Sequence, residues 1–104
     1  MRSLTTSPEA RLGKLRRRVD AADRRLLRAL ADRFSAVHEI IVEKEAISLG
    51  SFQKARWEEV VATRSDWAMS LGLDQRFVSA LLRLIHSESL RIQRQSRKKG
   101  KQVS

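Results

Sequence analysis

Apolar residues follow a helical spacing from the N-terminal region of the chain to near Ile47. They recur every three, four or seven positions, and neither glycine nor proline interrupts the pattern after Gly13. The stripe consists of Leu12, Leu15, Val19, Ala22, Leu26, Leu30, Val37 and Ile41. Ser7 precedes Pro8 and Glu9, an order typical of a helix start. The pattern therefore predicts one helix from about residue 8 to Ile47.

Two shorter helices are predicted after a stop at residues 48–51 (SLGS). The second covers residues 52–70 and ends at Gly72, and Asp74 is the N-cap of the third. Apolar residues of the third helix again recur at helical spacing, at Phe77, Leu81, Leu84, Ile85 and Ile92. Four glycines and one proline are too few for the turns of a many-stranded sheet. We therefore expect an all-α fold in a single domain over residues 1–104, structured over about residues 8–95.

The first predicted helix is too long for one small domain. It would span on the order of 60 Å, whereas a compact domain of 100 residues has a radius of gyration of about 13 Å. Two short helices cannot cover the apolar stripe of such a rod. We therefore expect a second copy of the chain to cover it, in an intertwined homodimeric helical bundle.

Two cations lie within or beside this stripe. Arg33 lies between Leu30 and Val37 at helical spacing. Lys44 follows Arg33 by eleven residues, which places it about 20° away around the helix and about 16 Å along it. A cation on a buried face is costly unless an anion meets it, and acids are few in this chain. The pattern indicates an anionic ligand, although pairing with Asp or Glu side chains is the alternative.

The net charge of +10 by itself suggests a polyanionic partner such as nucleic acid. Much of the excess lies in residues 91–101 (RIQRQSRKKGK), which contain no acid and resemble a frayed, solvated tail. We expect residues 96–104 to form this basic tail. A basic helical module that binds nucleic acid is the alternative from another functional class, but it does not explain the placement of Arg33 and Lys44.

Several classes of site are not supported by the sequence. There is no cysteine, and the string that begins at His38-Glu39 has Val42 where a zinc motif needs its second histidine. We expect neither metal nor cofactor. No apolar run reaches the length of a membrane span, and the first residues lack the apolar region of a signal peptide, so a cytoplasmic protein without membrane contact is expected.

Three motifs together resemble the all-α chorismate mutases. They are LGKLRRRVDAADRRLLRALADR at residues 12–33, LGLDQRFV at 71–78 and LIHSESLRIQ at 84–93. The resemblance implies a homodimeric enzyme that converts the dianion chorismate into prephenate, an isomerase of aromatic amino acid biosynthesis. It places the family's site residues on Arg16, reaching across from the partner subunit, and on Arg33, Lys44, Arg56, Ser89 and Gln93. In the family, Arg33 and Arg56 would hold carboxylates, while Lys44 and Gln93 would bind the ether oxygen.

Two positions of the predicted site depart from the family pattern. Trp57 stands where the family usually has a Glu that contacts the ring hydroxyl of the substrate, and Gln53 stands where it often has Asp. Trp offers one N–H donor and no acceptor, so the substrate is in question. An isochorismate pyruvate lyase, a 4-amino-4-deoxychorismate mutase and an inactive regulatory domain are the alternatives. Trp57 could also simply pack against the first helix.

Overall fold

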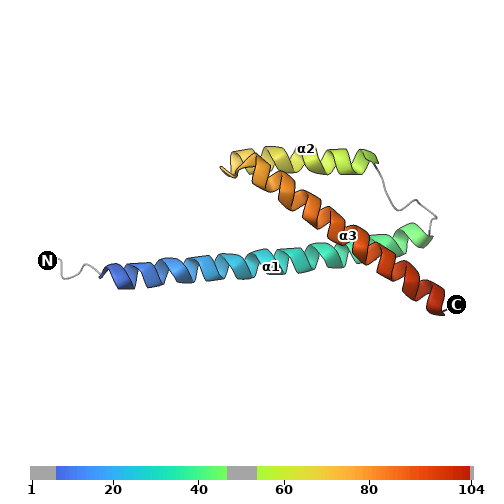
Figure 1. Ribbon diagram of the computed structural model, residues 1–104, viewed down its shortest axis with the longest axis horizontal. Coiled ribbons are helices and arrows are strands. Elements are labelled where there is room, and N and C mark those ends of the chain that lie inside the picture. Colours follow the sequence, from blue (N-terminus) through green and yellow to red (C-terminus); the bar gives the residue numbers. More distant parts are fainter. Residues whose placement is uncertain (1–6, 47–53, 104) are drawn as a thin grey trace. The chain divides into compact units, whose positions relative to one another are not determined.

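The computed structural model describes residues 7–46 and 54–103, which form three α-helices and no strand within those ranges (Figure 1). The helices are α1 (Pro8–Ala46), α2 (Lys54–Ser70) and α3 (Gln75–Val103). The predicted all-α class and the order of three helices are confirmed. The predicted start of the second helix at Phe52 lies outside the described residues.

The N-cap predicted for α1 is formed by Ser7. Its hydroxyl oxygen accepts a hydrogen bond from the backbone N–H of Ala10 (3.1 Å), and its carbonyl oxygen accepts the first helical bond from Arg11 (3.0 Å). Pro8 occupies the first helical position, where its missing N–H leaves no bond unmade. Local side-chain chemistry therefore fixes the beginning of α1.

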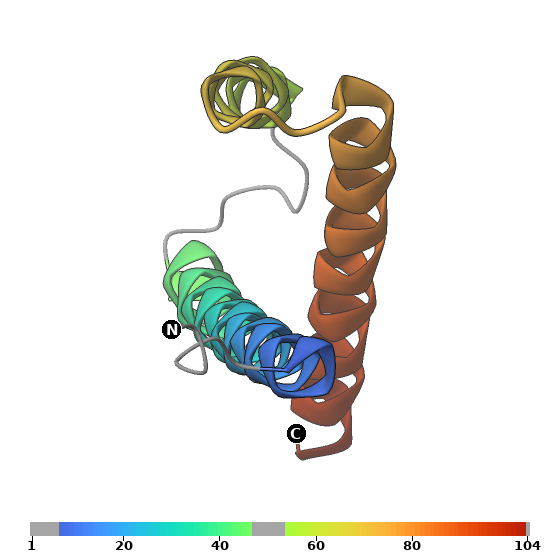
Figure 2. The same ribbon diagram turned by 90° about the vertical axis from the view of Figure 1, so that its left-hand side faces the viewer.

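A short turn connects α2 to α3 (Figure 2), and the helix end on each side of it is capped. Gly72 has a positive φ of 73°, and its N–H bonds to the carbonyl of Met69 (3.1 Å), while Leu73 bonds to Ala68 (2.9 Å). This pair of bonds is the Schellman arrangement that ends helices at glycine. Asp74 then begins α3, because its carboxylate accepts a bond from the N–H of Phe77 (2.9 Å). Both capping predictions are confirmed.

A small apolar core holds α2 against α3. Val60 (5% exposed) and Ala68 (3%) of α2 pack with Val78 and Leu82 (7%) of α3, and Trp57 packs against this cluster. The hairpin also leaves large apolar side chains exposed around its turn, namely Trp67, Met69, Leu71, Leu73 and Phe77. The hairpin thus has a small apolar core of its own.

The chain divides into two units, one that ends at Ser35 and one that begins at Ala36. Among the described residues of the first unit, none is buried, and the apolar stripe stays open: Leu15 is 51% exposed and Val19 58%. The part of α1 in the second unit differs, since Ile41 there is only 4% exposed. Taken by itself, the first unit therefore leaves its apolar stripe exposed.

The C-terminal segment differs from the expectation of a frayed tail after residue 95. It belongs to α3, which continues to Val103. Arg, Lys and Gln are good helix formers, and no proline interrupts them. Side-chain bonds from Arg91 back to Glu88, one turn earlier, support the helix just before this segment. Intrinsic propensity prevails over charge repulsion in this segment.

Candidate active site

The predicted site residues are distributed over all three helices. Arg16 and Arg33 belong to the first unit of the chain. Those in the second unit are Lys44 on α1, Arg56 and Trp57 on α2, and Ser89 and Gln93 on α3. The side chain of Lys44 and all of Gln53 lie outside the described part of the structure. The second unit thus brings the predicted residues of α2 and α3 into one hairpin.

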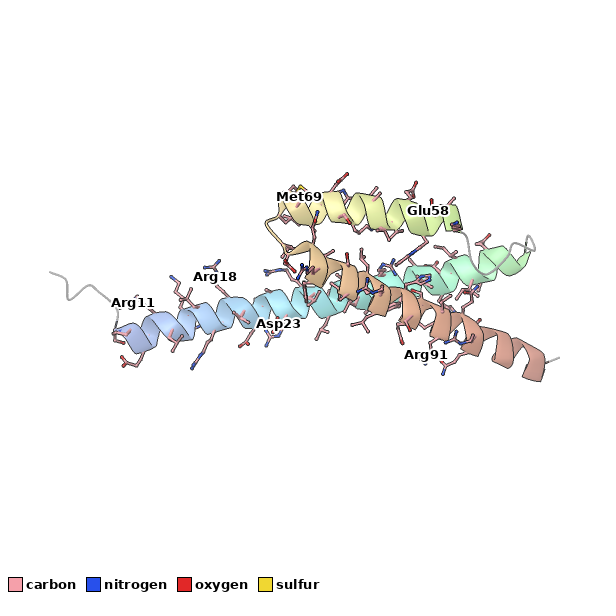
Figure 3. All side chains as sticks on the ribbon, turned by 45° about the horizontal axis from the view of Figure 1, so that its top comes forward. Arg11, Arg18, Asp23, Glu58, Met69 and Arg91 are labelled. Carbon is pink, nitrogen blue, oxygen red and sulfur yellow. The ribbon has the colours of Figure 1, made fainter. Side chains whose placement is uncertain are left out.

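On α1, the two predicted arginines differ in their surroundings. Arg16 is exposed, as are other charged side chains of this region such as Arg18 and Asp23, which project away from the helix axis (Figure 3). Arg33 is half-buried, like Leu30 one turn earlier. The stripe also carries a shallow hollow that is open to solvent, lined by Leu15, Arg18, Val19, Ala21, Ala22 and Arg25. Apolar side chains with flanking cations thus face outward from α1.

Arg56 forms an ion pair with Glu59 on the next turn of α2. Both side chains are more than half exposed. An exposed pair of this kind contributes only about 0–1 kcal/mol, so the guanidinium can exchange Glu59 for another carboxylate at little cost. Glu59 was not among the residues predicted for the site, although its spacing of three residues from Arg56 favours such a pair.

Trp57 lies half-buried between α2 and α3, and its ring meets that of His86. The ring centroids are 4.3 Å apart, with 30° between the planes. Trp57 also packs on the core cluster of Val60, Ala68, Val78 and Leu82. His86 was not among the residues predicted for the site. Its position three residues before Ser89 and seven before Gln93, on the same side of α3, was the available indication.

The polar side of α3 carries Ser89 and Gln93, both half-buried. The Ser89 hydroxyl donates to the carbonyl oxygen of Ile85 (3.0 Å). Nearby, Arg91 donates two hydrogen bonds to Glu88, from Nε (2.7 Å) and Nη2 (2.5 Å). The hydrogen bond from Arg91 holds the pKa of Glu88 below its ordinary value, with the positive charge of Arg91 adding to the effect. Glu88 is therefore anionic at neutral pH and bound to a neighbour on its own helix.

The chemistry of these residues is that of anion binding. Arg16, Arg33 and Arg56 are permanent cations whose planar forks match carboxylates. In the described part of the chain, no group of three or more His, Asp or Glu side chains is placed to hold a metal ion. Within the same ranges, no helix has an apolar stretch that could cross a bilayer. Each of these arginine side chains is thus chemically suited to binding a carboxylate.

The family model described as chorismate mutase type II matches residues 15–94. This range begins one residue before Arg16 and ends one residue after Gln93, so it contains every predicted site residue. Neither a curated protein nor a solved structure matches the chain significantly. Because the matched range covers well over half of the sequence and its all-α fold is the one observed, the chain belongs to the chorismate mutase type II family.

Proposed function

We propose that the chain is a homodimeric chorismate mutase that rearranges chorismate to prephenate. The observation that carries this proposal is the extent of the family match, which encloses every predicted site residue from Arg16 to Gln93. The half-buried placement of Arg33, Ser89 and Gln93 and the exchangeable ion pair of Arg56 support it. The expectation of a cytoplasmic enzyme remains a prediction.

The reaction requires conformational control and charge stabilisation. The rearrangement is unimolecular, so no nucleophile, metal or general base takes part. Arg33 and Arg56 would hold the two carboxylates and so keep the side chain of chorismate over its ring, which lowers the entropic part of the barrier. Lys44 and Gln93 would donate to the ether oxygen, where negative charge grows as the C–O bond breaks.

The homodimer is the part of the proposal that the exposed stripe of α1 supports. Five Leu and Val side chains of α1 are each about half exposed or more in one chain, namely Leu12, Leu15, Val19 and Leu26 of the stripe and the neighbouring Leu27. Covering half of such a side chain contributes roughly 1 kcal/mol, so the set favours association by several kcal/mol. The hollow along Leu15 and Val19 is a place where apolar side chains of a second copy can pack.

The position of Arg16 gives the dimer a role in the site. Arg16 precedes Arg33 by 17 residues on one continuous helix, which places it about 25 Å away along the axis. No side chain covers that distance to reach the same small substrate. An antiparallel partner helix would bring its own Arg16 to the Arg33 of the first subunit, so that each site takes residues from both chains.

Incubation with three substrates tests the function. We expect chorismate to be converted to prephenate, while isochorismate and 4-amino-4-deoxychorismate are converted much more slowly, as measured by chromatography of the products. Release of pyruvate from isochorismate as the main reaction would identify a lyase and overturn the proposal. Titration with duplex DNA at two salt concentrations is the control for the basic segment, because phosphate binding weakens steeply with salt.

A further inference from the structure

The contact between Trp57 and His86 occurs at the position where this chain departs from its family. Trp57 stands where the family resemblance leads us to expect Glu, and its ring centroid lies 4.3 Å from that of His86. Trp57 also packs against the core cluster of the hairpin. Since both aromatic rings are half-buried, each restricts the rotamers of the other.

His86 is on the side of α3 that carries the predicted substrate contacts. At 100° per residue, His86, Ser89 and Gln93 fall within a sector of about 60°. His86 precedes Ser89 by one turn, about 4.5 Å along the axis. The ring contact therefore joins Trp57 of α2, which departs from the family pattern, to the polar side of α3.

The imidazole provides the chemistry that Trp57 lacks. An indole offers a single N–H donor and cannot accept a hydrogen bond from a hydroxyl. A neutral imidazole offers one donor and one acceptor, so it can accept from a substrate hydroxyl as a carboxylate does. It does so without a negative charge, which distinguishes it from Glu.

We propose that Trp57 and His86 form the specificity-determining pair of the site, in which His86 contacts the ring hydroxyl of the substrate and Trp57 positions it. This inference rests on the proposed function and specifies its substrate. The pair replaces the carboxylate expected from the family with an imidazole, which carries no negative charge. It therefore selects a ring hydroxyl over a ring ammonium, because an ammonium would lose the counter-charge that Glu provides.

The test compares His86→Phe with the wild-type enzyme on chorismate and on an analogue that lacks the ring hydroxyl. Phe keeps the stacking with Trp57 and removes the hydrogen bond. We expect kcat/KM and the affinity for chorismate, measured by calorimetry, to fall about tenfold to a hundredfold. With the analogue, the variant and the wild type should be equal. His38→Phe is the matched control, since His38 is exposed on α1. This variant should leave kcat/KM unchanged for both substrates.

A rescue variant separates a direct contact from a structural role. Trp57→Glu restores the carboxylate, so the double variant with His86→Phe should recover chorismate turnover relative to His86→Phe alone. If His86→Phe lowers kcat/KM equally for both substrates, or for neither, the proposed role of the pair is wrong. Chorismate that binds in a His86-dependent way without being converted would keep the pair and reject the mutase. Failure of the wild type to bind chorismate at all would overturn both.

Discussion

The N-terminal unit and the α2–α3 hairpin use their apolar residues in opposite ways. In the hairpin, Val60, Ala68, Val78 and Leu82 bury one another within a single chain. In the first unit, the described residues include no buried side chain, although the apolar stripe there extends over more turns of helix than the hairpin core does. Helix formation in both regions is locally encoded by caps and periodicity. Burial is local only in the hairpin.

The hairpin can be stabilised within one chain, whereas we expect the exposed stripe of α1 to need a second chain. A helix in water gains most of its stability from packing of its apolar face. The hairpin has such packing, whereas α1 before Ala36 presents its face to solvent. If the partner covers α1, perturbations of the stripe will change association, and perturbations of the hairpin will change the fold of each chain.

The largest expected effect concerns Lys44, near the end of α1 in the second unit. Lys44→Ala should lower kcat by about 10²–10³-fold, because the role we propose for the ammonium is to stabilise charge that develops only in the transition state. Lys14→Ala, in the first unit of the same helix, is the matched control and should leave kcat unchanged. Near-normal turnover by the Lys44 variant would contradict the proposed mechanism.

The second prediction sets the two regions directly against each other. Leu82→Ala removes a side chain that is 7% exposed and should cost about 2–5 kcal/mol of the free energy of unfolding. Leu15→Glu should instead shift the protein from dimer to monomer, since it places a charge in the proposed interface. Sedimentation well below the melting temperature measures the association. A Leu15→Glu protein that remains dimeric would remove the stripe from the interface.

The third prediction tests whether the first unit of one chain and the hairpin of its partner contribute to the same site. An equal mixture of Arg16→Ala and Arg56→Ala, unfolded and refolded together, gives mixed dimers in about half of the population. One of the two sites in each mixed dimer is then wild type, so roughly a quarter of wild-type activity should return. If mixed dimers are shown to be present and stay inactive, each site is built within one chain.

The smallest effect is expected at the end of α3. Removal of residues 100–104 should leave turnover unchanged, because the last predicted site residue, Gln93, lies seven residues before the cut. The melting temperature should fall only slightly, since fraying removes few contacts from a helix end. Loss of activity would show that the basic segment takes part in the site or the interface.

Local chemistry explains which parts of the fold the sequence could predict. Ser7, Gly72 and Asp74 act through bonds to residues within five positions, so their roles as caps followed directly from residue type. The end of α3 was predicted too early, because a dense positive charge was weighed above helix propensity. Charge on a helix surface is solvated and screened, and it seldom ends the helix.

The candidate site was less accessible to prediction because it depends on alignment between helices. The contact of Trp57 with His86 needs the register of α2 against α3, which no pattern within either helix reveals. The pairing of Arg56 with Glu59 is within one helix and was predictable in principle. The roles assigned to Arg16, Arg33, Lys44, Gln53, Ser89 and Gln93 stay predictions, since they concern a bound substrate.

The turn at residues 71–74 has a consequence for the order of folding. It is closed by a glycine cap and an aspartate cap within a few residues, and it joins core residues that lie close in sequence. Contacts of short sequence separation close quickly, with little loss of chain entropy. We expect the hairpin to form in a fast step that does not depend on protein concentration. Association along α1 would follow as a bimolecular step, so dilution should slow the return of activity without slowing the return of helix.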